Sequence, residues 1–332
     1  MPILTHKEPF QILAHSDKVL IIQTNAGVQL ASDATAKSNS YGLFNLGLHV
    51  HDDPINVLHN RAQLLQLINE YLATSHHKST VEVIHWLSQI HSNKVIRIDK
   101  NEPYKGSLSA PEADAMIINH VNQALAIMTA DCVPIVIYDP KSGQTAAIHA
   151  GWQGLANGVI FETFYELNKH KISCNKQTSA LEELNTSTSN SATSSICLLK
   201  TTPQAWIGAC ISQACYEVSQ EVVDKLVMGC EKLGMDIEMV RHKIVGNHDD
   251  PNKAWLDLPK LAKLQLNQLG IQVEAPIGSS AEASFDEKKD GQELSSALAC
   301  SYADSRYYSY RRKTHLGENN TGRMALLIIK FA

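Results

Sequence analysis

The sequence predicts an α/β protein in which amphipathic helices each cover a β-sheet. Two observations carry this prediction. Short apolar runs recur along the chain, and segments with apolar residues three or four positions apart lie between them. The chain has 332 residues, of which 44% are hydrophobic and 19% charged. Such a chain can bury a sizeable core, as an ordinary globular protein does.

The apolar runs have the length and composition of buried strands. In chain order, the predicted strands are residues 19–22, 81–86, 95–98, 124–128, 135–138, 145–149, 205–208, 271–274 and 324–329.

The first predicted helix has a clear start. Asp53 can cap it, and Pro54 lacks the N–H group that would be unpaired at this position. Leu64, Ile68 and Leu72 continue one apolar face.

Three further helices are predicted from the same spacing of apolar residues. One runs from about 155 to 167, one follows Ser219, and one begins at 258 and closes at Gly270. Because all are amphipathic, each is expected to cover a sheet.

Two polar segments interrupt this alternation, at about residues 174–195 and 279–296. Both are rich in small polar residues and have almost no apolar periodicity. Strand patterns of the same kind resume after each segment. They are therefore expected to be surface insertions rather than linkers between domains.

Charge and hydropathy exclude several classes of protein. The formal net charge is −5 and the Lys and Arg residues are scattered, so no basic stripe is available for nucleic acid. No apolar run approaches the roughly 20 residues needed to cross a bilayer. The N-terminal segment lacks the pattern of a signal peptide. A cytoplasmic location is expected.

The seven cysteines have irregular spacings and form no C-x-x-C pair. Disulfides are not expected in a chain that does not look secreted. Most of the cysteines are expected to be reduced and to pack as small apolar side chains.

Cys132 and His149 stand out in TADCVPIVIYDPKSGQTAAIHAGWQG, residues 129–154. His149 ends a predicted strand, and Gly151 and Gly154 follow near a helix start. Ligands of α/β proteins tend to bind beyond the carboxyl ends of strands. Cys132 lies in a predicted turn before the strand at 135–138. Both residues are therefore well placed for function.

These two residues allow three interpretations. They could be a small apolar thiol and a hydrogen-bonded imidazole in the core. They could be a thiolate nucleophile and its base. They could also be two ligands of a metal ion, which would then need a third donor.

His91 is the best candidate for the third donor, because it lies between a Trp- and Leu-rich run and the next predicted strand and has polar neighbours. His49 and His51 would share one face of an extended segment. However, Asp52, Asp53 and the helix start beside them predict a solvated turn.

Six blocks of sequence together resemble a known family. They are NLGLHVHDDP with Asn60–Arg61, WLSQIHS, ADAMI with TADCVPI, AAIHAGWQGLANGV, WIGACISQACYEV, and SYRRK followed by TGRMA. They extend from about residue 41 to 330 and resemble the YfiH-like laccase-domain family, also described as purine nucleoside phosphorylases and multicopper polyphenol oxidoreductases. The resemblance implies one domain over residues 1–332, a mixed-sheet α/β sandwich flanked by helices, similar to the deamidase domain of a cytotoxic necrotizing factor.

The resemblance also implies one zinc ion bound by His91, Cys132 and His149, the three residues favoured above on their placement. Three protein ligands leave a tetrahedral zinc ion one open position, where a bound water can ionise near neutral pH and act in catalysis. Copper is possible but less favoured. A multicopper centre needs several H-x-H pairs, and only His49-Val50-His51 has that form.

The resemblance further implies phosphorolysis of adenosine, inosine, guanosine and methylthioadenosine, and deamination of adenosine. The expected partners are a purine nucleoside and either phosphate or water, with no nucleic acid, no membrane and no identified protein partner. The arginines among the substrate residues have an alternative interpretation as structural or surface ion pairs. The residues expected to bind substrate are Asn45, Arg61, Asp131, Arg311, Arg312 and Arg323.

Two positions depart from the family pattern, because Gln153 and Asn25 stand where relatives have arginine. These departures make a decayed site plausible, and two alternatives to the zinc enzyme remain open. One is an amide hydrolase that uses Cys132 and His149, in keeping with a peptidoglycan-editing role linked to the family. The other is a binding protein whose catalytic site has decayed.

Overall fold

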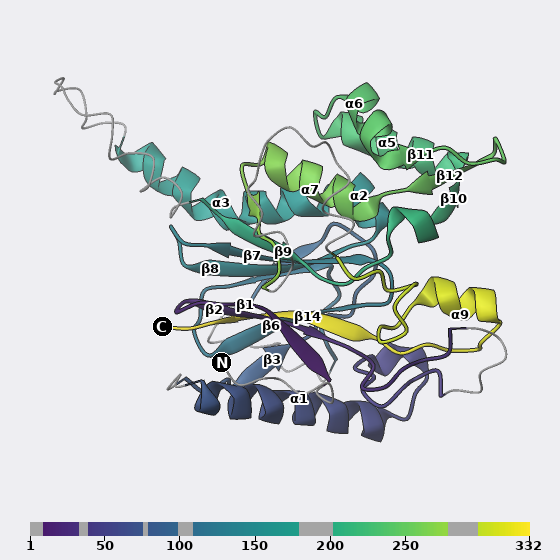
Figure 1. The fold of residues 1–332 in the computed structure, drawn as a ribbon. Coiled ribbons are helices and arrows are strands. Elements are labelled where there is room, and N and C mark those ends of the chain that lie inside the picture. Colours follow the sequence, from purple (N-terminus) through teal and green to yellow (C-terminus); the bar gives the residue numbers. More distant parts are fainter. Residues whose placement is uncertain (1–8, 33–38, 76–78, 99–108, 179–201, 278–297) are drawn as a thin grey trace.

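The structure is a computed structural model that describes residues 9–32, 39–75, 79–98, 109–178, 202–277 and 298–332. Two sheets lie face to face, and helices cover the outer face of each (Figure 1). Both sheets contain parallel and antiparallel neighbours. The predicted mixed-sheet sandwich flanked by helices is therefore confirmed.

The central strand of the five-stranded sheet is β14, the C-terminal strand among those that the structure describes. Only β3 and β6 are parallel, and the other neighbours are antiparallel. In spatial order its strands are β1 (Phe10–His15), β2 (Val19–Thr24), β14 (Met324–Lys330), β6 (Gln123–Thr129) and β3 (Val83–His85).

The six-stranded sheet has antiparallel strands at its centre and a parallel pair at each edge. In spatial order its strands are β13 (Gln272–Val273), β9 (Gln204–Ile207), β7 (Val133–Asp139), β8 (Gln144–Ala150), β5 (Ala115–Ile118) and β4 (Val95–Arg97).

A smaller sheet lies beside the upper helices. Its strands are β10 (Glu217–Ser219), β12 (Lys253–Leu256) and β11 (Val245–Gly246). The helices are α1 (Pro54–Thr74), α2 (Trp152–Ala156), α3 (Val159–Thr178), α5 (Gln220–Lys232), α6 (Ile237–Ile244), α7 (Leu258–Gln268) and α9 (Tyr310–Leu316).

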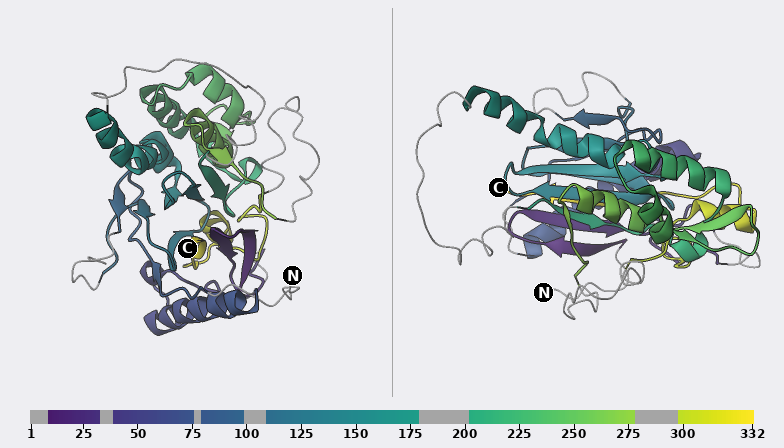
Figure 2. Two further views of the ribbon diagram at one scale, coloured as in Figure 1. Left: turned by 90° about the vertical axis from the view of Figure 1, so that its left-hand side faces the viewer. Right: turned by 90° about the horizontal axis from the view of Figure 1, so that it is seen from above.

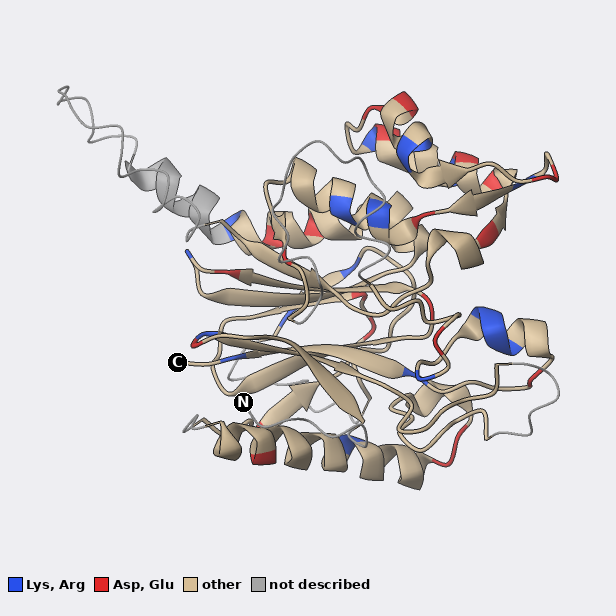
Figure 3. Cartoon of the chain, in the orientation of Figure 1, with Lys and Arg blue, Asp and Glu red and all other residues tan. Residues whose placement is uncertain are grey.

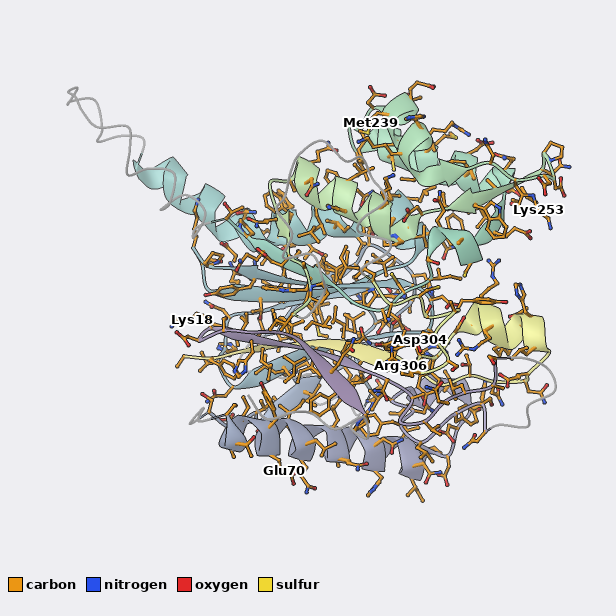
Figure 4. The ribbon with its side chains drawn as sticks, in the orientation of Figure 1. Lys18, Glu70, Met239, Lys253, Asp304 and Arg306 are labelled. Carbon is orange, nitrogen blue, oxygen red and sulfur yellow. The ribbon has the colours of Figure 1, made fainter. Side chains whose placement is uncertain are left out.

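Helix α1 covers the five-stranded sheet, on the side opposite α3 and α7 (Figure 2). As predicted, Asp53 caps it by accepting a hydrogen bond from the N–H of Ile55, and Leu64, Ile68 and Leu72 are buried. Glu70, on the outer side of the helix, points away from the sheet (Figure 4).

Alternation along β2 separates two layers of the core. Ile21 packs between the two sheets, whereas Ile22 packs in the layer with Leu64 of α1. Because successive side chains of a strand point to opposite faces, both faces of this sheet are buried. The third layer joins the six-stranded sheet to α2, α3, α5 and α7. Charged residues lie mainly on the helices and loops that surround these layers (Figure 3).

The predicted helix at 155–167 is wrong in its boundaries, because it is two helices. α2 ends at Ala156, and Gly158 has a φ of +78°, outside the range that a right-handed helix can adopt. α3 continues to Thr178, so the first residues of the polar segment predicted at 174–195 are helical. Residues 179–195 and 279–296 lie outside the described residues.

Candidate metal centre

Three polar side chains meet at one end of the sandwich. His91 lies in the loop between β3 and β4, Cys132 in the turn between β6 and β7, and His149 near the end of β8. The pairing of β7 with β8 sets Pro134 opposite His149, which brings the turn containing Cys132 to the end of β8. The loop that carries His91 reaches the same point, so Cys132 lies next to a residue 41 positions away in the sequence.

The geometry of this cluster suits a metal ion. One potential ligand atom from each of His91, Cys132 and His149 lies within 4.8 Å of the other two. The Cys132 sulfur is 3.9 Å from Nε2 of His91. His149 is buried, Cys132 is half-buried and His91 is exposed, so the cluster is open on one side. The three residues could hold a metal ion.

Asp114 orients both histidines, and the sequence argument missed it. Its Oδ1 accepts hydrogen bonds from Nδ1 of His149 at 2.8 Å and from the backbone N–H of His91 at 3.0 Å. Its Oδ2 accepts from the backbone N–H and the hydroxyl of Ser92, at 2.6 and 2.7 Å. Because Nδ1 of His149 is bonded to Asp114, its Nε2 atom remains available to bind a metal. Metal-binding histidines usually donate their other ring N–H group to a carboxylate in this way.

Electrostatics favour the ionised form of Asp114 and Cys132. Burial opposes charge on Asp114, but hydrogen bonds from His149 and Ser92 lower the pKa of its carboxyl to about 2. Burial likewise opposes a thiolate, but the positive charge of His149 and hydrogen bonds from both histidines lower the pKa of Cys132 to about 6. Cys132 is then deprotonated at neutral pH, as a metal ligand or a nucleophile must be.

Gly151 leaves space for the cluster. A Cβ atom at this position would lie 3.1 Å from the sulfur of Cys132 and 3.2 Å from Cδ2 of His91. Both distances are shorter than ordinary van der Waals contact. Any larger residue would press on two of the three candidate ligands.

Asp131 is built into the support of the Cys132 turn. Its backbone has a φ of +107°, which L-residues rarely adopt. Its carboxylate accepts hydrogen bonds from the Ser301 hydroxyl and from the backbone N–H of Arg311, both at 2.7 Å. Its carbonyl accepts from the N–H of Ile211 at 3.0 Å. Asp131 therefore ties the turn to the C-terminal part of the chain.

Asn45, Arg61 and Arg323 surround one segment beside the centre. Oδ1 of Asn45 accepts from the backbone N–H groups of Gly47 and Arg323, at 3.0 and 2.8 Å. Arg61 donates from Nε and Nη2 to the carbonyl of Leu46, at 3.0 and 2.8 Å. These contacts fasten the chain just before the 3-10 helix η1 (Leu48–Val50).

His49 lies on this 3-10 helix, in the solvated turn that the sequence predicts. Partial burial, the positive charges of Arg323 and Arg61, and His149 and His91 lower its pKa to about 4. His49 is therefore neutral at pH 7 and within electrostatic range of the metal centre. The sequence argument assigned it no function.

Arg311 and Arg312 bond to main-chain carbonyls. Nη1 of Arg312, a buried residue, donates to the carbonyls of Ser301 and Tyr302, at 2.7 and 2.8 Å. Nη1 of Arg311 donates to the carbonyl of Glu217 at 2.7 Å. Neither side chain forms an ion pair with a carboxylate among the described residues. These contacts differ from the structural or surface ion pairs that were the alternative interpretation of these arginines.

The two positions where relatives are expected to carry arginine differ in their surroundings. Gln153 is exposed in the first turn of α2, two residues after Gly151. Oδ1 of Asn25 accepts a hydrogen bond from the N–H of Gly27 at 2.7 Å and so stabilises a turn.

The fold and the site together define the class of protein. It is an α/β sandwich whose His-Cys-His cluster could hold a metal ion. The chain belongs to the multi-copper polyphenol oxidoreductase laccase family, whose model matches residues 28–182 and 182–330. Among the described residues, no helix has both the length and the apolar composition needed to cross a bilayer.

Curated relatives carry names from nucleoside metabolism. The chain is 28% identical over 290 residues to a purine nucleoside phosphorylase of Haemophilus influenzae, covering 87% of each chain. It is 29% identical over 287 residues to a purine nucleoside phosphorylase of Corynebacterium glutamicum, covering 86% of each.

Solved structures share the fold. A Neisseria meningitidis protein is 24% identical, with a TM-score of 0.62, and the match covers 98% of this chain and 100% of that one. YlmD from Geobacillus stearothermophilus is 20% identical, with the same TM-score and coverage.

Proposed function

We propose that this chain is a zinc-dependent enzyme of purine nucleosides, which catalyses their phosphorolysis and, as a second reaction, the deamination of adenosine. The names of its relatives support the substrate class. The single observation that carries the proposal is the cluster of His91, Cys132 and His149, with ligand atoms within 4.8 Å of one another.

The donor set fits zinc. Two imidazole nitrogens and one thiolate match the ligands of catalytic zinc sites, which use three protein ligands. A bound zinc ion would supply a Lewis acid with one coordination position open to substrate or water. Copper binds similar donors, so the metal content of the protein must be measured.

The residues beside the cluster fit an anionic co-substrate. Arg323 forms no ion pair with a carboxylate among the described residues, and its Nη1 donates only to the carbonyls of Thr321 and Gly322, at 3.3 and 3.0 Å. Arg323 and Arg61 both lie within electrostatic range of His49. Arginine donors make charge-assisted hydrogen bonds to phosphate. We assign phosphate binding to this group.

Asn45 has a positioning role in this proposal. Its carbonyl oxygen accepts from the backbone of Arg323, and its amide nitrogen donates to Asp52 at 2.9 Å. Because both ends of the side chain are bonded within the protein, Asn45 orients the segment beside Arg323.

A second candidate is an amide hydrolase. Asp114, His149 and Cys132 follow one another in contact, which is the order of an orienting carboxylate, a base and a nucleophile. A metal ion on Cys132 would block this chemistry, so the metal content distinguishes the two candidates.

The test is product analysis of the purified full chain, with its metal quantified, on adenosine with and without phosphate. Adenine formed only with phosphate indicates phosphorolysis, and inosine indicates deamination. Both should disappear on chelation and return with zinc. Turnover unaffected by chelation would contradict the proposal. A stoichiometric metal without turnover would favour a binding protein.

A further inference from the structure

Three cysteines outside the metal centre come together where residues 209–215 run beside residues 299–301. Cys210 and Cys300 face each other in a short parallel bridge. The N–H of Ser301 donates to the carbonyl of Cys210 at 2.9 Å. Cys210 is buried, whereas Cys215 and Cys300 are half-buried. All three are free thiols.

The sulfur of Cys300 is surrounded by hydrogen-bond donors. The hydroxyl and the backbone N–H of Ser212 lie 3.1 and 3.4 Å from it. The backbone amides of Ala303 and Tyr302 also lower the pKa of this thiol. A sulfur atom that accepts several such bonds is stabilised as the thiolate, the reactive form of cysteine. These bonds outweigh burial and lower the pKa of Cys300.

Cys215 is held against this sulfur. It ends the 3-10 helix η2 (Gln213–Cys215), and its N–H donates to the carbonyl of Ser212 at 3.0 Å. Ser212 thus contacts both cysteines, because its hydroxyl lies 3.1 Å from the Cys300 sulfur, and the effect of Cys300 on the pKa of Cys215 agrees with their closeness. Burial raises the pKa of Cys215. The pair therefore combines a sulfur that favours ionisation with a neighbouring protonated thiol.

We propose that Cys300 and Cys215 form a peroxide-sensitive thiol pair that closes to a disulfide. The Cys300 thiolate attacks one oxygen of a hydroperoxide, the O–O bond breaks, and the departing hydroxide or alkoxide takes a proton. Cys300 becomes a sulfenic acid. The Cys215 sulfur then attacks the Cys300 sulfur, its proton and the hydroxyl group leave as water, and the S–S bond forms. The two thiols together lose two electrons to the peroxide.

Cys300 is next in sequence to Ser301, a residue that helps to hold the Cys132 turn in place. Ser301, which follows Cys300, donates its hydroxyl hydrogen to the carboxylate of Asp131, and Asp131 precedes Cys132. A change at Cys300 therefore acts on the segment that anchors the Cys132 turn.

The test is oxidation of the zinc-loaded full chain with hydrogen peroxide, followed by alkylation and non-reducing peptide mass spectrometry. The expected product is a disulfide-linked pair of peptides that contain Cys215 and Cys300. Cys300→Ser should abolish this product, and Cys230→Ser, which changes a buried thiol of another core layer, should retain it. Recovery of both thiols fully alkylated, or of Cys300 as sulfinic acid beside a free Cys215, would overturn the proposal.

A second measurement does not depend on removing a cysteine. Ser212→Ala deletes the hydroxyl donor, which should slow alkylation of Cys300 at pH 7 by about three- to tenfold, since a pKa change of about one unit alters the thiolate fraction about tenfold. Ser212→Thr keeps a hydroxyl group and should preserve the rate. An unchanged rate in Ser212→Ala would show that these donors do not activate Cys300.

Discussion

Oδ1 of Asp114 is bonded to two ligand-bearing residues at once, to the ring of His149 at 2.8 Å and to the backbone of His91 at 3.0 Å. The same carboxylate is completely buried and bonds Ser92 through its other oxygen. One side chain therefore sets the orientation of one candidate ligand and the path of the chain at another. The metal centre should respond to changes at Asp114, although this residue offers no ligand itself.

Asp114→Asn should weaken zinc binding by about 10- to 100-fold, the usual effect of removing a carboxylate behind a ligating histidine. Chelator competition measures the affinity, and circular dichroism checks the fold. Asp224→Asn on α5, which removes an exposed ion pair with Arg241 of α6, serves as the control. Equal affinities for the two variants would refute this role.

Cys132→Ala and His149→Ala should each lose most of the bound zinc, because each removes one of the three proposed protein ligands. Elemental analysis of purified protein measures the metal content. Cys215→Ala and His315→Ala change the same residue types outside the cluster and should retain the metal. Full zinc occupancy in either ligand variant would rule out the assigned site.

Gly151→Ala should reduce metal affinity while the fold remains, because its Cβ atom would lie 3.1 Å from the Cys132 sulfur. The backbone at Gly151 has a φ of −71°, which alanine adopts readily, so crowding is the only effect. Gly246→Ala is the matched control, since its Cβ atom would be crowded to a similar degree by Gln213 and Trp255, at 3.2 and 3.3 Å, away from the cluster. The idea fails if the two variants bind zinc alike.

Gln153→Arg should increase phosphorolysis by about ten- to a hundredfold if the new side chain reaches phosphate in the transition state. A charge-assisted hydrogen bond contributes about 1.5–3 kcal/mol. Deamination uses no phosphate and should change little. Asn25→Arg should help less, because it also removes the hydrogen bond to Gly27. Both rates are measured across phosphate concentrations. An equal rise in both reactions would exclude a phosphate contact.

His85 should make the protein less stable in acid. Burial lowers its pKa, although a hydrogen bond with Gln123 opposes the shift. Below the ordinary pKa of about 6.5, His85 binds a proton in the unfolded chain but not in the folded chain. The free energy of unfolding therefore decreases as the pH is lowered, until the pH reaches the lower pKa of the folded state. In denaturant titrations from pH 7 to 5, His85→Gln should show a shallower loss than wild type. The exposed His315→Gln should match wild type, and identical slopes in all three proteins would contradict the prediction.

The elements predicted correctly are those whose signals are local. The start of α1 follows from Asp53 and Pro54 alone, and the interior of β7 follows from its apolar run. The strands at Phe10–His15 and Ala115–Ile118 were missed. The first mixes polar residues into an edge strand, and the second is a short apolar run between Asp114 and Asn119. The division between α2 and α3 was missed because Gly158 also occurs within continuous helices.

Among the site residues, too, those with a local sequence signal could be predicted and those without one could not. His91, Cys132 and His149 stand out because each is a metal-ligating residue next to a predicted strand. Asp114 does not, because its importance comes from contacts to residues 22 to 35 positions away. Arg312 shows the converse, since a charged residue expected at substrate is buried against main-chain carbonyls.

The position of β14 has a consequence for synthesis of the protein. This strand is made after every other strand that the structure describes, yet it lies between β2 and β6, and both strands pair with it along most of their length. While the chain is still on the ribosome, the sheet has two open edges at its centre, with apolar side chains on both faces. Unpaired edges of this kind promote association with other chains. A message cut short before residue 324 would therefore yield an aggregating fragment rather than a smaller stable protein.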